Sequence, residues 1–253
     1  LCRLGTATLT PQIIDMLPQL LANKEHSVRR YSADMICKLD TRTMLQISKA
    51  VTRLLMNKEH SVRRRAAGGV CELGTAAATP EMLEALTNLL ADENKDVRLS
   101  AAETVKKMIT AVEAPKILKM LPQLLMDEEH NVRRCASEMV AKLGIIAGTP
   151  EILDVLTRML VDENKAVRSL GAETVSNLGT TAAVPQILKM LPQLSVDEEY
   201  SVRRFAADMV GKMGIIAGTP EVLNVLTRMV VDENKTVRSL AVETVSNLGT
   251  AAV

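Results

Sequence analysis

The dipeptide Val-Arg recurs along the whole chain at a nearly constant interval. Successive copies are separated by 34 residues once and by 35 residues five times. The copies are Val28-Arg29, Val62-Arg63, Val97-Arg98, Val132-Arg133, Val167-Arg168, Val202-Arg203 and Val237-Arg238. A period of this length means that the chain repeats one small structural unit, and any fold must be built from that unit.

Each unit contains two segments with the apolar spacing of an α-helix, separated by short polar turns. The first segment often starts with Thr-Pro, a hydroxyl cap before a proline at the first helical position, at 10–11, 79–80, 149–150 and 219–220. The second segment ends at a glycine in several units, which is a helix stop signal. These glycines are Gly74, Gly144, Gly179, Gly214 and Gly249. The pattern predicts a helix hairpin in each unit.

A hairpin of about 35 residues is too small to bury a core alone, so neighbouring hairpins must stack. The predicted fold class is all-α, an α-solenoid of about seven antiparallel helix hairpins. We expect a single repeat domain over residues 1–253, with the hairpins in residues 8–253. Residues 1–7 align with the end of a second helix, which indicates a fragment of a longer repeat array.

In five units an Asp in the turn between the two helices precedes the Arg of the dipeptide by six residues. The pairs are Asp92 with Arg98, Asp127 with Arg133, Asp162 with Arg168, Asp197 with Arg203, and Asp232 with Arg238. This arrangement resembles HEAT repeats over the whole chain, and the resemblance implies a HEAT-like superhelix. We expect each carboxylate to accept from the Arg fork and from amides of the second helix, so that stacked pairs form a structural ladder. Asn23 and Asn57 replace the Asp in the first two units, so the charge-assisted contact is not predicted there.

Helical geometry places one row with several arginines and one mostly acidic row on the concave surface formed by the second helices. We predict that a partner peptide or helix with both charges contacts these rows. The predicted partner-binding residues are Arg30, Asp34, Arg64, Glu103, Arg134, Glu138, Glu173, Arg204, Asp208 and Glu243. Tyr31, Phe205, Leu170 and Leu240 lie at the edge of the same helices, as packing residues or as anchors for that partner.

A solvated surface is the alternative interpretation of the same rows. Arg30 with Asp34, Arg134 with Glu138, and Arg204 with Asp208 are spaced as i,i+4 pairs. Such pairs contribute only about 0.2–0.5 kcal/mol each and serve to keep a helix surface soluble.

The rest of the sequence gives little support for chemistry. His26, His60 and His130 each follow a Glu, which invites comparison with the deoxyhypusine hydroxylases, HEAT-like enzymes that bind two irons through His-Glu pairs. Here the order is reversed and the residues lie in turns, so neither a metal nor any other cofactor is predicted. Cys2, Cys37 and Cys71 share one position in successive units, too far apart for disulfides between helices separated by about 8–10 Å.

The charge balance argues against strongly electrostatic partners. The chain has 31 Lys and Arg against 30 Asp and Glu, and no apolar run reaches the roughly 18 residues of a membrane span. HEAT-like DNA glycosylases line their groove with basic and aromatic residues, whereas this chain has one Phe, two Tyr and no Trp. We therefore predict a cytoplasmic, non-enzymatic scaffold that binds a protein or peptide and no membrane. A nucleic-acid-binding HEAT-like module and a metal-dependent HEAT-like hydroxylase are the alternatives.

Overall fold

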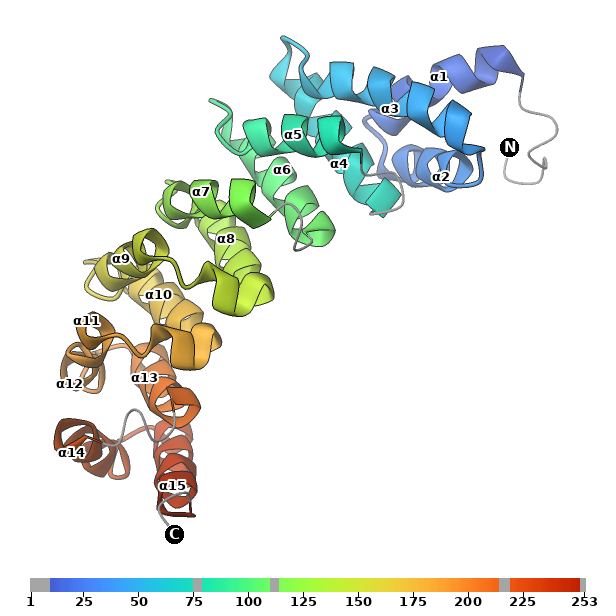
Figure 1. Ribbon diagram of the computed structural model, residues 1–253. Coiled ribbons are helices and arrows are strands. Elements are labelled where there is room, and N and C mark those ends of the chain that lie inside the picture. The colour runs from blue at the N-terminus through green and yellow to red at the C-terminus, as the bar shows by residue number, and fades with distance from the viewer. Residues whose placement is uncertain (1–9, 75–78, 110–113, 214–218, 251–253) are drawn as a thin grey trace. The chain divides into compact units, whose positions relative to one another are not determined.

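The computed structural model describes residues 10–74, 79–109, 114–213 and 219–250 (Figure 1). All regular structure in these ranges is helical, which confirms the all-α prediction. The helices follow one another as seven pairs in the described residues, with 3-10 turns η3 (Gly144–Ala147) and η4 (Gly179–Ala182) between some pairs. Their bounds are α1 (Pro11–Leu21), α2 (His26–Ile36), α3 (Thr41–Leu55), α4 (His60–Leu73), α5 (Pro80–Leu89), α6 (Lys95–Met108), α7 (Ala114–Leu125), α8 (His130–Leu143), α9 (Pro150–Met159), α10 (Lys165–Leu178), α11 (Pro185–Leu188), α12 (Leu191–Leu194), α13 (Tyr200–Met213), α14 (Pro220–Met229) and α15 (Lys235–Thr250).

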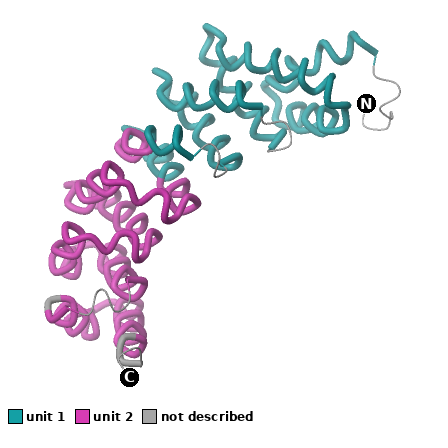
Figure 2. Tube along the Cα trace, in the orientation of Figure 1, with its two compact units in different colours: residues 1–120, 127–136 teal, residues 121–126, 137–253 magenta. Residues whose placement is uncertain are grey.

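The chain divides into two compact units (Figure 2). Unit 1 comprises Leu1–Met120 and Asp127–Ala136, and unit 2 comprises Leu121–Met126 and Ser137–Val253. The division passes through α7 and α8, so each of these helices contributes residues to both units. A single repeat domain over residues 1–253 stays a prediction, and the expected helix end at 1–7 lies outside the described residues.

The Thr-Pro dipeptides begin helices as predicted. Helices α1, α5, α9 and α14 start at the proline, which lacks an amide hydrogen that would have no partner in the first turn. In α5, α9 and α14 the threonine hydroxyl accepts a hydrogen bond from the amide three residues later, at 3.3 to 3.4 Å. These caps fix where the first helix of each of these hairpins begins.

Helix α3 lacks the Thr-Pro signal and uses an aspartate cap. The Asp40 carboxylate accepts from the amides of Arg42 and Thr43 at 3.0 and 3.1 Å, and from the Thr43 hydroxyl at 2.6 Å. The hydrogen bond from the Thr43 side chain and those from the two amides hold the pKa of Asp40 below its usual value. The stretch 40–50, which departs most from the repeat in sequence, therefore still begins an ordinary first helix.

The predicted glycine stop signals are confirmed at three positions. Gly74, Gly144 and Gly179 have φ angles of 63°, 54° and 56°, a region that residues with a Cβ seldom adopt. Gly214 lies outside the described residues. The predicted stop at Gly249 was wrong, because α15 continues to Thr250.

Aliphatic side chains and Met fill the core of each hairpin, as the shortage of aromatic residues requires. In the α9 and α10 hairpin, Ile152, Leu156, Met159 and Val175 are fully buried. Burial of such a side chain is worth about 1.5–3 kcal/mol. The second helices also pack against one another, α4 against α2 and α6 in unit 1, and α13 against α10 and α15 in unit 2. We call the outward side of these neighbouring helices the second-helix face.

Candidate functional site

The turn aspartates and arginines form a ladder of contacts between repeats. The Arg98 guanidinium donates from Nε and Nη2 to the carboxylate of Asp127, in the next repeat, at 2.7 and 3.1 Å. Its Nη1 donates to the backbone carbonyls of Asp92 and Glu93 in its own repeat, at 3.0 and 3.2 Å. The same two-oxygen contact to the next repeat joins Arg63 to Asp92, Arg168 to Asp197, and Arg203 to Asp232.

The predicted pairing within each repeat was therefore wrong in register. For Asp92 with Arg98, Asp127 with Arg133, Asp162 with Arg168, Asp197 with Arg203, and Asp232 with Arg238, the Arg Nη1 reaches the backbone carbonyl of the Asp. The carboxylate of the same Asp instead accepts the amide two residues later, as in Asp92 and Asn94 at 2.9 Å. One Arg thus uses one edge for its own turn and leaves the Nε and Nη2 edge for the neighbouring repeat.

The ladder side chains are shielded and charged. In the four pairs between repeats both side chains are only 7 to 12% exposed. Burial opposes ionisation of Asp92, but hydrogen bonds from Arg63 and the Asn94 amide, with the charges of Arg63 and Arg98, hold its pKa below the usual value. The hydrogen bond to Asp92 raises the pKa of Arg63. These groups stabilise the stack of repeats and have no open edge for a ligand.

The two asparagines change the ladder at one place only. Asn57 Oδ1 accepts from the Glu59 amide at 2.9 Å, as the aspartates do in other turns. Arg63, in the same repeat, still has a carboxylate partner because Asp92 belongs to the next repeat. Arg29 is the residue affected, since Asn57 stands where its acidic partner would be. The Nε of Arg29 is buried and has no hydrogen-bond partner among the described residues.

The predicted partner-binding residues lie on the second-helix face with different exposure. Arg30, Asp34, Arg64, Glu103, Arg134, Glu173 and Glu243 are exposed, and Glu138, Arg204 and Asp208 are half-buried. Of the proposed anchors, Tyr31 is 49% exposed, Phe205 and Leu240 are half-buried, and Leu170 is buried in the core. Whether these residues bind a partner stays a prediction.

The charged side chains of this face pair differently from the i,i+4 expectation in unit 2. Asp208 accepts from Lys212 Nζ at 2.8 Å, four residues onward, and from the hydroxyl of Ser176. The Arg204 guanidinium instead lies over the ring of Phe205, 4.1 Å from its centroid. Stacking of this kind is favourable by about 0.5–1 kcal/mol at exposed sites, so Arg204 has a preferred position before any partner arrives.

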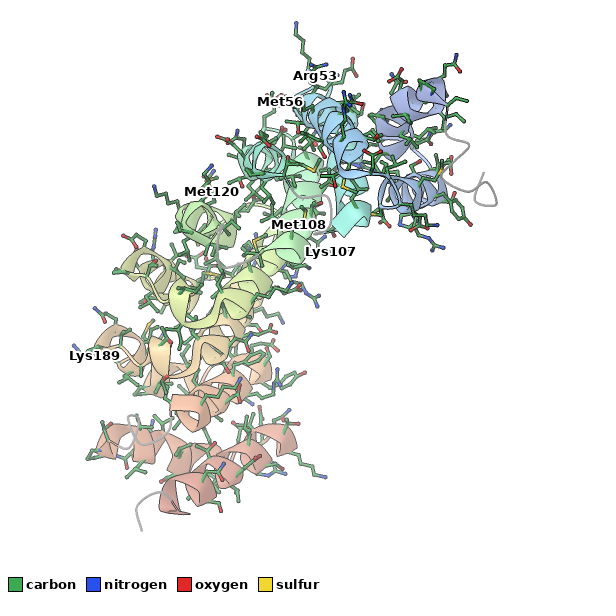
Figure 3. All side chains as sticks on the ribbon, turned by 45° about the vertical axis from the view of Figure 1, so that its right-hand side comes forward. Arg53, Met56, Lys107, Met108, Met120 and Lys189 are labelled. Carbon is green, nitrogen blue, oxygen red and sulfur yellow. The ribbon has the colours of Figure 1, made fainter. Side chains whose placement is uncertain are left out.

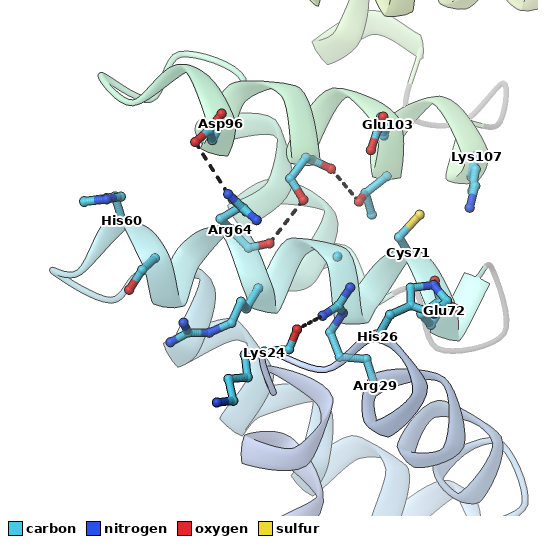
Figure 4. A pocket seen from close by; sticks show the side chains of 15 residues that line it. Lys24, His26, Arg29, His60, Arg64, Cys71, Glu72, Asp96, Glu103 and Lys107 are labelled. Carbon is cyan, nitrogen blue, oxygen red and sulfur yellow. Dashed lines mark hydrogen bonds and ion pairs between the residues drawn. The ribbon is translucent and has the colours of Figure 1, made fainter.

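An open pocket of about 490 Å³ lies on the second-helix face of unit 1, over α2, α4 and α6 (Figure 4). Five Lys and Arg side chains line it against three carboxylates. The basic residues are Lys24, Arg29, Arg64, Arg65 and Lys107, and the acidic ones are Glu72, Asp96 and Glu103. Of these only Arg64 and Glu103 were predicted as partner-binding residues. The pocket has an excess of positive charge although the whole chain is nearly neutral.

Lys107 marks the edge of this pocket. It extends from α6 next to the buried Met108 (Figure 3). Hydrogen bonding with Cys71, on α4, raises the pKa of Lys107. Burial, with the nearby Asp34 carboxylate, raises the pKa of the Cys37 thiol, which makes its reactive thiolate form scarcer.

Two searches over the described residues give negative results. No group of three or more His, Cys, Asp or Glu side chains is arranged to hold a metal ion in the described ranges. None of the helices described is both long enough and apolar enough to cross a membrane.

Comparison with known proteins identifies the fold. No protein-family model and no curated protein matches the sequence. An archaeal HEAT-like repeat protein from Thermococcus onnurineus NA1 has a similar structure with a TM-score of 0.67 at 16% identity, covering 97% of this chain and 100% of that one. The chain has the HEAT-like solenoid fold. Importin beta is similar at a TM-score of 0.66 and 12% identity, over 96% of this chain and 36% of its own. An engineered protein reaches 0.58 at 17% identity, over 94% and 68%.

Proposed function

We propose that this HEAT-like chain is a non-enzymatic interaction scaffold that binds a peptide or helix of a protein partner along the second-helix face. The observation that supports this proposal is the division of charged residues into two sets. The ladder arginines and aspartates are shielded and fully engaged with one another, whereas most of the charged rows on the second-helix face are exposed. A charged side chain that is not needed for folding is available for recognition.

The chemistry of this face favours a peptide with both charges. In unit 1, Arg64 of α4 lies near Asp96 of α6 at 3.5 Å, and both side chains are more than half exposed. A pair that is so open and so long contributes little to stability and can exchange for a contact with a partner at little cost. Alternating basic and acidic groups of this kind provide specificity and orientation more than affinity.

The test starts with peptides selected from a random display library on the purified protein. Charge reversal of both Arg134 and Arg204 to Glu should weaken binding of the selected peptides by about tenfold or more. The matched control is charge reversal of Arg53 and Arg158 to Glu, because both are exposed arginines on first helices, α3 and α9 (Figure 3 labels Arg53).

The control variant should bind the selected peptides like the unmodified protein, and circular dichroism should show equal helicity for all three. Equal loss in both variants would mean that net charge alone governs binding, and the second-helix face would have to be abandoned as the site. Failure to select any peptide would also overturn the proposal.

A further inference from the structure

Two departures from the repeat meet in the pocket of unit 1. Asn57 stands where four other turns have the aspartate that pairs with the preceding Arg. Gly68 interrupts the acidic row, which has Asp or Glu at the equivalent position of the other repeats, as in Asp34 and Glu103. The first departure leaves an arginine without its carboxylate, and the second leaves space on the surface of α4.

Arg29 faces that space. Its Nη1 donates to the carbonyls of Asn23 and Lys24 at 3.0 and 3.1 Å, which holds the guanidinium in place. Its Nε lies 3.7 Å from the point where a Cβ on Gly68 would be, and Ser100 Oγ lies 3.8 Å from the same point. Figure 4 shows Arg29 directed from α2 toward α4. We call the space over Gly68, between Arg29 and Ser100, the Gly68 notch.

The unpaired Nε needs an acceptor. A buried N–H group without a hydrogen bond costs about 1–3 kcal/mol, and more where the group is charged, so native structures seldom retain one. The carboxylates nearby are already in contact with other cations, Asp96 with Arg64 at 3.5 Å and Glu72 with His26 at 3.3 Å. The local charge also favours an anion, because Lys24, Arg65 and Lys107 line the same pocket.

We propose that the Gly68 notch binds a carboxylate side chain of an acidic peptide, with Arg29 Nε as donor. The peptide would supply the carboxylate that Gly68 does not, on a row where the other repeats supply their own. Carboxylates are also the groups that the equivalent arginines bind in the ladder. The inference rests on the proposed function and gives it a ligand chemistry and a position in unit 1.

The test uses a fluorescein-labelled oligoglutamate peptide and fluorescence anisotropy at low salt. The unmodified protein should bind it at least about tenfold more tightly than an oligoglutamine peptide of equal length, since one charge-assisted hydrogen bond corresponds to roughly that factor. A phosphoserine peptide that binds tenfold more tightly than oligoglutamate would overturn the assignment to a carboxylate.

Two variants address the notch from opposite sides. Gly68→Glu fills the space and provides an internal carboxylate, so oligoglutamate affinity should fall about tenfold or more. Asn57→Asp restores the ladder partner of Arg29 and should lower affinity in the same way without altering the pocket wall. Asn23→Asp is the matched control, because it makes the same change of residue and charge in the preceding turn, and it should lower affinity less than twofold or so.

Thermal melts establish that each variant is folded. If Gly68→Glu does not fold, Asn57→Asp against Asn23→Asp still decides the question. Equal affinity of both aspartate variants would exclude Arg29 as the donor. Failure of the notch is distinguishable from failure of the scaffold function, because the display-selected peptides and the Arg134 and Arg204 variant test the latter independently.

Discussion

Arg63 and Asp92 belong to consecutive repeats and are joined by two hydrogen bonds, Nε to Oδ2 at 2.7 Å and Nη2 to Oδ1 at 2.9 Å. Arg63 also donates to the carbonyl of Asn57 in its own turn at 2.9 Å. One guanidinium therefore closes the turn of one hairpin and attaches it to the next. This double contact explains why the Val-Arg dipeptide recurs through the chain, since each hairpin depends on its neighbour for stability.

A double-mutant cycle should detect the register of the ladder. We expect Arg168→Gln and Asp197→Asn to show a coupling free energy of about 1–3 kcal/mol in urea unfolding, because they remove the same charge-assisted contact. Arg203→Gln and Asp197→Asn are the control cycle, since Arg203 contacts only the backbone carbonyl of Asp197. Its coupling should be near zero, and a larger value there than in the first cycle would restore the pairing within the repeat.

Asn57→Asp should stabilise the protein. The new carboxylate would accept from the buried Nε of Arg29, and a gain of about 1 kcal/mol is expected for a contact of this kind. The measurement is the free energy of unfolding in urea. Asn23→Asp should change it by less than about 0.5 kcal/mol. A loss of stability in Asn57→Asp would show that Arg29 cannot turn toward residue 57.

The ladder predicts a specific sensitivity to acid. The folded pKa values of Asp92 and Asp232 lie below the unfolded value, because the Arg and amide hydrogen bonds outweigh the opposing effect of burial. Their contribution to stability is therefore complete above the unfolded pKa of about 3.9 and is lost as pH falls through the folded pKa. Melting temperatures measured from neutral pH down to strong acid should fall steeply in this window.

The comparison for the acid experiment is the variant with Asp92→Asn and Asp232→Asn. It should be less stable at neutral pH but should lose less stability on acidification, since the two titrating groups are gone. If both proteins have the same dependence on pH below about 4, the acid sensitivity arises elsewhere.

The hairpins could be predicted from the sequence because their signals are local. A threonine before Pro80 or a glycine after Leu73 fixes a helix end through contacts within a few residues. The cap by Asp40 is equally local, although it lacks the repeat pattern. Such signals depend on backbone geometry alone, which is why the fold class followed from the period.

The ladder register could not be found in the same way. In a repeating chain, Asp92 lies at a constant separation both from Arg98 and from Arg63, so periodicity fits either pairing equally well. Only the direction of the guanidinium decides between them. The Gly68 notch was missed for a related reason, since Arg29 belongs to the ladder series and Gly68 to the row on the surface, and packing alone brings them together.

Two adjacent glycines of α4 should respond oppositely to alanine. A Cβ on Gly68 would meet its nearest neighbours at 3.7 and 3.8 Å, which is ordinary contact, so Gly68→Ala should raise stability by up to about 1 kcal/mol through helix propensity. A Cβ on Gly69 would overlap the backbone carbonyl of Leu21 at the end of α1, so Gly69→Ala should lower stability by about 1–3 kcal/mol. Urea unfolding of the two variants provides the measurement. Changes of equal sign and size would contradict the close approach of α1 to α4, on which the packing of the first hairpins in unit 1 depends.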